Sequence, residues 1–381
     1  FFYFFSSSFF SAVELSFSAF LYSFIPKSTI WKLFIKKKVK SNIGKFQKGL
    51  LDSIRSDNDH VIATADKGLG PVRVELHRYV EDALVHLTNA STYEILPTEQ
   101  GWDEARDLKW EIFDWIANHR TALARQEADY LRKKLEVTRD DPFGYFYLLY
   151  KLHKTPTSTR PVCSDCGSLP HALGQWVDEK LQPIVKAQPT YIKDSFSFKT
   201  SISDLRLPPN ASIFTYDAVS MYTNIDTAHA LFVISDFLHN HPLCHELSVI
   251  AEPLITALAI IMRHNVFQFG DAYWKQLSGT AMGAPPAPTC ANASFATFEA
   301  STILPKYKSN LAYYKRYIDD VFGIWIPDPD PRRDAELWSL FQADLNSWHG
   351  LEWIVSNQSS TAVFLDVTLH LQDTTISSTL F

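Results

Sequence analysis

Two adjacent carboxylates, Asp319 and Asp320, interrupt the aromatic and β-branched run "AYYKRYIDDVFGIW". The flanking segments "YYKRYI" and "VFGIW" have β-strand composition, so we expect a tight hairpin turn at the two aspartates that lifts both carboxylates out of the sheet. The two like charges repel each other, but they would hold a bound Mg²⁺, which prefers carboxylate oxygen. Because Asp also favours ordinary turns, a metal site here requires a third acid.

Asp217 can supply that third acid. "SIFTYDAV" alternates as a strand that places Asp217 near its end, ahead of a turn or helix start in "SMYTN". An aspartate in an apolar strand is costly unless a cation or hydrogen-bond donors satisfy it. Three carboxylates from two neighbouring strands can hold two ions about 4 Å apart, which activates an attacking 3′-hydroxyl and stabilises a leaving pyrophosphate. The interval between Asp217 and Asp319 leaves room for a helical layer.

A block that could contact a base and sugar lies between the two acidic strands, in "YWKQLSGTAMGAPPAPTCANASF". Gln276 can donate or accept hydrogen bonds, while Gly279 and Gly283 allow close approach of the backbone, ahead of a helix expected after the prolines. By itself the block would be interpreted as a loop with a buried helix. Its position between the acids favours a functional role.

A basic block lies upstream, in "LLYKLHKTPTSTRPVCSDCGSLPHAL". Lys151, Lys154 and Arg160 flank a strand-turn-strand pattern and could neutralise a triphosphate, with arginine suited to bidentate contacts. A solvated basic hairpin explains the same residues equally well. Cys163 and Cys166 form a single C-x-x-C without a second pair, which predicts buried thiols in a loop rather than a metal site.

The size and composition of the chain limit the classes of protein to which it can belong. The 381 residues, with 46% hydrophobic and 20% charged side chains, suffice for two or three subdomains of a globular protein. A net charge of -6 argues weakly against nucleic acid, but residues 27–48 hold eight lysines and no acid, so either a basic patch or a solvated tail is expected there. Four cysteines in so long a chain indicate a reducing compartment rather than a disulfide framework.

Several segments carry local structural expectations. The Phe- and Ser-rich residues 1–25 match neither a signal sequence nor a membrane span and are interpreted as a translated flank, with a cryptic membrane segment as the alternative. Apolar spacing predicts one or two helices within residues 102–137, and "FGYFYLLYKLHK" is typical of a strand. The three prolines of "PDPDPRRD", residues 327–334, predict a loop.

Six ordered blocks resemble the successive motifs of reverse transcriptases: "KLHKTPTSTRPV", "YIKDSFSFKT", "FTYDAVSMYTNI", "QLSGTAMGAPPAP", "RYIDDVFGIW" and "FLDVTLHL". More narrowly, they resemble the Penelope-like retroelement group, a relative of telomerase reverse transcriptase. The "ADKG" at residues 65–68 is similar to that group's N-terminal conserved segment. The resemblance covers residues 62–370, most of the chain.

The resemblance implies roles for matching residues. It assigns catalysis and the binding of Mg²⁺, with Mn²⁺ as an alternative, to three carboxylates: Asp217, Asp319 and Asp320. It assigns nucleotide binding to Lys154, Arg160, Tyr222, Gln276 and Gly283. Tyr222 matches the bulky gate that crowds a 2′-hydroxyl, and Lys154 and Arg160 match finger residues that contact the triphosphate. "FLDVTLHL" matches the hairpin that grips the primer end.

The resulting hypothesis is a retrotransposon RNA-directed DNA polymerase that transfers dNTPs onto a primer 3′-hydroxyl. The expected fold is an α+β right hand with fingers, an antiparallel palm sheet packed on helices and a truncated thumb. The expected partners are an RNA template, a DNA primer and dNTPs, with no membrane, in the nucleus. The expected boundaries are a flank at 1–45, a mostly helical extension at 46–140, fingers at 141–210, the palm at 211–360, and the primer-grip hairpin with the start of the thumb connection at 361–381.

Two alternatives stay open. One is a degenerate, catalytically silent element that only binds nucleic acid; the three intact carboxylates argue against it, and the chain's early stop after the grip hairpin argues for it. The other is a metal-dependent hydrolase with clustered acids. That alternative lacks an evident His or Glu base near Asp319 and leaves the Gln276 block unexplained.

Overall fold

The computed structural model describes residues 44–138, 140–240 and 249–380. Residues 1–25 and the start of the basic run therefore lie outside the described residues. No helix among the described residues is long and apolar enough to cross a membrane. The chain divides into two compact units and passes between them several times; the first of these boundaries falls within one long helix, α5 (Thr98–Asn118).

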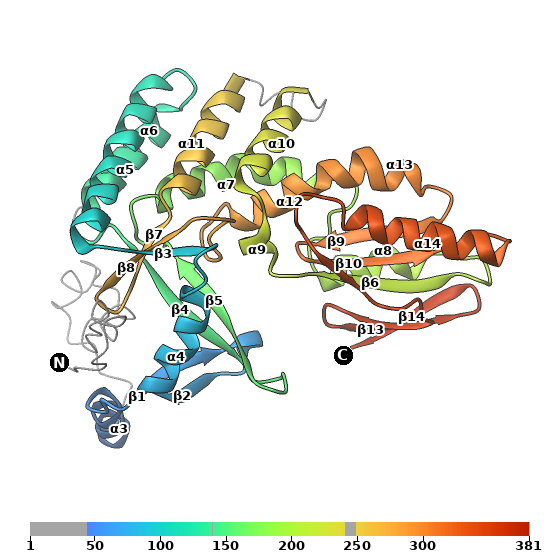
Figure 1. The fold of residues 1–381 in the computed structure, drawn as a ribbon, viewed down its shortest axis with the longest axis horizontal. Helices are drawn as coiled ribbons and strands as arrows, with labels where there is room; N and C mark the ends of the chain where they lie inside the picture. Colours follow the sequence, from blue (N-terminus) through green and yellow to red (C-terminus); the bar gives the residue numbers. More distant parts are fainter. Residues whose placement is uncertain (1–43, 139, 241–248, 381) are drawn as a thin grey trace. The chain divides into compact units, whose positions relative to one another are not determined.

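The first unit comprises residues 1–107, 138–169 and 264–277, of which the first 43 are not described. Its elements, besides the start of α5, are α3 (Lys45–Arg55), β1 (His60–Ala65), the 3₁₀ turn η1 (Asp66–Gly68), β2 (Pro71–Glu75), α4 (Leu76–Leu87), β3 (Tyr93–Leu96), β4 (Gly144–Lys151), β5 (Ser158–Ser164), β7 (Val266–Phe269) and β8 (Ala272–Gln276). All seven strands form one mixed sheet (Figure 1).

Strand β4 organises this sheet. One edge of β4 pairs antiparallel with β5 over its whole length, while its other edge runs parallel to β1 near its end and to β7 near its start. The burial of β4 alternates strictly, as expected for a strand with one buried face. The predicted strand-turn-strand pattern around the basic block is therefore confirmed.

The second unit comprises residues 108–137, 170–263 and 278–381. Its helices, besides the rest of α5, are α6 (Arg125–Val137), α7 (His171–Lys186), α8 (Ser195–Ser203), α9 (Met221–Asn224), α10 (Thr227–Asn240), α11 (Ala251–Arg263), α12 (Ala287–Phe298), the π-turn η3 (Glu299–Ile303), α13 (Leu304–Lys306) and α14 (Pro331–Leu345). Its strands are β6 (Ser212–Ala218), β9 (Leu311–Tyr317), β10 (Asp320–Trp325), β11 (Trp353–Val355), β12 (Thr361–Phe364), β13 (Val367–Gln372) and β14 (Thr375–Leu380).

A four-stranded antiparallel sheet in the order β11-β6-β10-β9 forms the centre of the second unit. One face of this sheet, which includes Phe214, Tyr216 and Val321, packs on α12 and α14. The other face, which includes Ile213 and Phe322, packs on α8 and on the three-stranded β12-β13-β14 sheet. Figure 1 shows α14 along one side of the sheet and β13 and β14 along the other.

The predicted α+β class is confirmed, and the loop predicted for residues 327–334 is corrected. Residues 327–334 are not all loop, because α14 already begins at Pro331, with Asp330 as its N-cap. A proline in the first helical turn loses no hydrogen bond and has a helical φ, so the third proline starts the helix instead of preventing it. The predicted domain boundaries stay predictions; the first compact unit itself combines three separate segments of the chain.

Candidate active site

The two acidic strands lie side by side in the second unit. Strands β6 and β10 pair antiparallel, and Asp217 lies directly opposite Asp320. Directly opposed residues project their side chains from the same face of a sheet, about 4.5–5.5 Å apart at Cβ. A row of opposed residues thus crosses the sheet end: Tyr317, Asp320, Asp217 and Ile354.

The face that carries this row is the one that packs on α8 and the three-stranded sheet further along. Asp217 is exposed and Asp320 is half-buried, so the packing ends before it reaches the carboxylates. The strands are therefore anchored by apolar residues in the middle of the sheet, and their acidic ends are accessible to solvent.

The hairpin turn between β9 and β10 differs by one residue from the prediction. Tyr317 pairs with Asp320, so the turn consists of Ile318 and Asp319, and Asp320 is already part of the strand. Ile318 has a φ of 56°. Such a value is an outlier for a β-branched residue and costs about 1–3 kcal/mol, and strain of this kind concentrates at functional sites. The backbone carbonyl of Asp319 accepts a hydrogen bond from Ala218 N (3.0 Å), which joins the turn to β6.

The donor set of this sheet end suits a hard divalent cation. Mg²⁺ is usually held by one or two carboxylates together with water and substrate phosphates, rather than by a cage of protein ligands. Asp217 and Asp320 provide such a carboxylate pair, and Asp319 adjoins it in the chain. Within the described ranges, no group of three or more His, Cys, Asp or Glu side chains is arranged to hold a metal ion. The structure thus brings two carboxylates together on one face, without a finished three-ligand site.

A buried ion pair lies beneath the turn. Arg316 on β9 is 2% exposed, and Glu299, at the start of η3, is fully buried. Arg316 Nε and Nη2 donate to the two oxygens of Glu299 at 2.8 and 3.0 Å, and Nη1 donates to the carbonyl of Ile318 at 2.9 Å. Arg316 is therefore bonded both to an acid in the core and to the strained residue of the turn.

Neighbouring groups satisfy the rest of this cluster. Arg316 also donates to the side-chain and backbone oxygens of Asn292 on α12. Glu299 accepts further hydrogen bonds from the hydroxyls of Thr190 (2.8 Å) and Tyr314 (3.1 Å). Burial and the nearby Glu299 carboxylate raise the pKa of Tyr314 well above its ordinary value, so its hydroxyl stays protonated as a donor.

Tyr222 lies on the short helix α9 that follows β6. Its side chain is half-buried and packs against the core cluster that includes Phe214. The helix begins after Ser220, which has a left-handed backbone with φ 47°. Gly279, with φ +78°, lies against this helix: a Cβ at that position would lie 2.1 Å from the carbonyl oxygen of Tyr222. The close approach expected of this glycine is thus made to the backbone that carries Tyr222.

Two other residues of the glycine block lie in separate units. Gln276 ends β8 in the first unit, is 4% exposed and accepts a hydrogen bond from Asn265 Nδ2 at 3.0 Å. Gly283, in the second unit, is exposed and has φ 120°. The helix predicted after the prolines is confirmed as α12.

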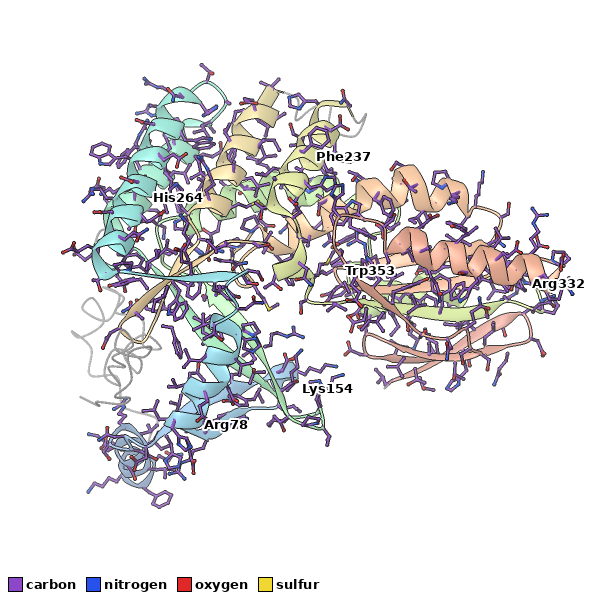
Figure 2. The ribbon with its side chains drawn as sticks, in the orientation of Figure 1. Arg78, Lys154, Phe237, His264, Arg332 and Trp353 are labelled. Carbon is purple, nitrogen blue, oxygen red and sulfur yellow. The ribbon has the colours of Figure 1, made fainter. Side chains whose placement is uncertain are left out.

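Lys154 and Arg160, from the basic block of the sequence, belong to the first unit. Lys154 is exposed in the turn that connects β4 and β5 (Figure 2). Arg160 on β5 has a partner that the sequence did not indicate: its Nη2 lies 3.4 Å from Oδ2 of Asp66, the aspartate of "ADKG". Asp66 is 8% exposed, and its Oδ1 accepts a hydrogen bond from Lys67 N at 3.0 Å.

The backbone of the "ADKG" turn explains its glycine and its place in the fold. Lys67 and Gly68 have φ values of 55° and 69°. The preceding Ala65 pairs with Tyr150 of β4, which places the turn next to the β4–β5 hairpin. The segment therefore supplies a buried carboxylate to Arg160 on the adjacent hairpin.

The cysteine pair matches the prediction only in part. Cys163 is buried on β5, and burial raises its pKa to about 12. Cys166 is exposed instead of buried, because it follows the end of β5 in the connecting turn.

The segment "FLDVTLHL" forms the predicted hairpin. Strands β12 and β13 pair from Phe364–Val367 outward, so Leu365 and Asp366 make the turn. Ser195, at the start of α8, donates a hydrogen bond to Asp366 at 2.7 Å. The turn is thereby fastened to the helix that packs beneath the four-stranded sheet.

Comparison with known proteins gives a likeness in structure alone. No protein-family model and no curated protein matches the sequence. The telomerase from Candida albicans, solved in complex with a fragment of telomeric RNA, superposes with a TM-score of 0.59 at 12% identity, over 87% of this chain and 55% of that chain. Apo telomerase from Candida tropicalis, truncated from its C-terminal domain, superposes with a TM-score of 0.55 at 9% identity, over 86% of this chain and 65% of that one.

The chain has the polymerase fold of telomerase reverse transcriptases. It spans between about half and two thirds of the length of these structures. The predicted polymerase fold is therefore confirmed.

The sequence alone did not identify Arg316 and Glu299 as a buried ion pair. Arg316 lies within the quoted "RYIDD" block, but its partner is an acid in a separate helical segment. A signal for Glu299 was present, because a lone acid in the apolar run "ANASFATFEASTI" requires a buried partner.

Proposed function

We propose that this chain is an RNA-directed DNA polymerase of the Penelope-like retroelement group, which transfers dNTPs onto a primer 3′-hydroxyl. The observation that carries the proposal is the placement of Asp217 directly opposite Asp320, at the end of a hairpin whose turn contains Asp319. The polymerase fold supports the reaction class. The six ordered motifs and the "ADKG" segment support the narrower group.

The carboxylates have a defined task in this reaction. Asp217 and Asp320, with Asp319 next to them, would hold Mg²⁺, or Mn²⁺ in its place. When bound, the metal lowers the pKa of the primer hydroxyl and offsets charge on the departing pyrophosphate. The sheet contributes position, since the aligned register fixes the two strand residues relative to each other before substrate arrives.

Other residues would select and hold the nucleotide. Tyr222 would crowd a 2′-hydroxyl, which favours deoxynucleotides. Lys154 and Arg160 would contact the triphosphate, and Arg160 would approach it already oriented by Asp66. Gln276 and Gly283 would border the nucleotide and the template.

The proposed partners are an RNA template and a DNA primer, in the nucleus. RNA is supported by the Candida albicans telomerase, which was solved with a fragment of telomeric RNA. The β12–β13 hairpin would hold the primer end. Its turn is tied to α8 through Asp366, which limits the movement of the hairpin against the sheet.

Primer extension tests the proposal. Purified chain, Mg²⁺ and dNTPs are incubated with a labelled DNA primer annealed to RNA or to DNA, and extension is measured with wild type and with Asp319→Asn. We expect wild type to extend the primer on RNA and Asp319→Asn to lose about 10²–10³-fold or more in rate, as when a group that stabilises transition-state charge is removed. Asp236→Asn, the same change on the exposed side of α10, should retain wild-type rates.

One outcome would reject the proposed function, and another would reject the role of Asp319. A wild-type chain that binds primer–template without extending it would favour the catalytically silent alternative. Full activity of Asp319→Asn would remove that carboxylate from the mechanism.

A further inference from the structure

The buried pair of Arg316 and Glu299 requires an explanation beyond stability. Two charges removed from water lose their hydration, and replacement of a buried ion pair by apolar residues is often neutral or stabilising. A fold selected for stability alone would therefore gain little from this pair. The contacts that the pair makes with neighbouring segments therefore need to be considered.

The guanidinium connects three segments of the second unit. Its two outer nitrogens reach Glu299 on η3, Asn292 on α12 and the carbonyl of Ile318 in the turn. The backbone of Arg316 is fixed as well, since its N–H donates to Thr190 O at 2.7 Å and its carbonyl accepts from Ile192 N at 3.2 Å. Both the side chain and the backbone of Arg316 are therefore held in place by hydrogen bonds.

Two backbone irregularities meet at this cluster. Ile318 has the left-handed φ of 56°, and Glu299 begins a π-turn that continues α12. Single π-turns inside helices are frequent at functional sites. The π-turn changes the helical phase at Glu299. The Glu299 carboxylate accepts hydrogen bonds from Arg316, and Arg316 in turn donates to the carbonyl of Ile318 in the hairpin turn.

We propose that Arg316, anchored by Glu299, is a positioning residue that holds the Ile318–Asp319 turn in its left-handed conformation and thereby fixes the metal-binding carboxylates Asp319 and Asp320. The inference rests on the proposed polymerase function. It adds a residue that touches neither metal nor nucleotide and acts through the backbone of the turn.

The test is the metal midpoint, the divalent cation concentration at half-maximal effect. It is measured in two ways. The first is the rise in Tm with increasing Mn²⁺ in the absence of primer and dNTPs, and the second is the rate of primer extension as a function of Mg²⁺ concentration. Arg316→Lys keeps the charge but replaces the planar fork, whose separate nitrogens bond Glu299 and Ile318 O, by a single ammonium nitrogen on a flexible stem. We expect the metal midpoint of this variant to rise about tenfold. Tyr307→Phe is the matched control: it removes a partly buried hydrogen bond to Asp344 at the edge of the same core, so it should lower Tm without moving the midpoint.

A second variant separates positioning from general damage. Glycine accepts a positive φ without penalty and is favoured at the first position of two-residue hairpin turns with that conformation. Ile318→Gly added to Arg316→Lys should therefore bring the midpoint back toward wild type, which a purely structural loss would not allow. If Arg316→Lys does not fold, Glu299→Gln, which keeps shape and removes the anchoring charge, is measured with and without Ile318→Gly.

The outcomes separate the proposed polymerase function from the positioning role of Arg316. A wild-type chain that neither responds to Mn²⁺ nor extends a primer refutes the proposed function, and the positioning role with it. A responsive wild type with an unchanged midpoint in Arg316→Lys refutes the positioning role alone. A raised midpoint that Ile318→Gly fails to lower also refutes it, because the turn would then not be what the arginine holds.

Discussion

The placement of Asp217 opposite Asp320 leads to a prediction about the stability of the metal-free protein. Without metal, Asp217→Asn should stabilise the protein, because Asp217 and Asp320 are like charges at directly opposed positions of adjacent strands. With carboxylates about 6 Å apart, Coulomb repulsion is about 0.7 kcal/mol at the dielectric constant of water and about 2.8 kcal/mol at an effective value of 20. Since Asp217 is exposed, the lower figure applies, and it agrees with the roughly 0.2–1 kcal/mol measured for cross-strand pairs.

Bound Mg²⁺ should make wild type more stable than Asp217→Asn. A wild-type site at ten times its dissociation constant for Mg²⁺ gains about 1.4 kcal/mol. Asp217→Asn loses one of the paired carboxylates, so its gain should be much smaller. The measurement is Tm by circular dichroism at low ionic strength, in EDTA and in a Mg²⁺ series. In EDTA the variant should melt about 1–3 °C above wild type, and in saturating Mg²⁺ below it.

Salt and a second variant control this experiment. In 0.15 M salt the screening length is about 8 Å, which should reduce the difference in EDTA by about half. Asp236→Asn removes the same charge from α10, away from the acidic strand ends, and should therefore show the same Mg²⁺-dependent rise in Tm as wild type. A lower Tm for Asp217→Asn in EDTA, or an equal Mg²⁺ shift in variant and wild type, would contradict the opposed-carboxylate geometry.

Three further predictions follow from other contacts. Gly323→Ala should destabilise the second unit by about 1–3 kcal/mol in thermal unfolding, because a Cβ there would lie 2.0 Å from an aromatic ring of β6; Gly49→Ala, which meets nothing within 4 Å, should not. Tyr222→Ala should admit ribonucleotides in primer extension, and unchanged discrimination would remove its gate role. Asp66→Asn and Arg160→Gln should each raise the KM for dNTPs, while the double variant should be no worse than Arg160→Gln; additive effects would show that the pair does not act together.

Local patterns predicted much of the fold around the candidate site. The alternation of "SIFTYDAV" identified β6, and β-branched and aromatic runs identified β9 and β10 on either side of the acids. These predictions succeed because a strand with two distinct faces has a period of two residues. The turn was misplaced by one residue because a "DD" pair favours a turn by composition, whereas the pairing of Tyr317 with Asp320 sets its position.

Long-range partners could not be predicted from these patterns. Gln276 was expected to border a nucleotide, and the sheet of the first unit adds a neighbour for it, Asn265, that the sequence did not indicate. Arg160 on β5 was expected to contact substrate, and it also faces Asp66 across β4, which pairs with β5 on one edge and with β1 on the other. Both outcomes depend on which strands become neighbours, and strand order is not encoded in the composition of any single strand.

The sequence by itself determined the residue types of the chemistry: three carboxylates on β-type segments, a tyrosine after the first of them, and glycines where the backbone has positive φ. The tertiary structure alone decided that Asp217 meets Asp320 in register and that Arg316 bonds Glu299 beneath the turn. The reason is physical. Alternation and turn preference act between near neighbours in the chain, whereas register and buried ion pairs arise only when whole strands and helices pack and distant polar groups must satisfy one another.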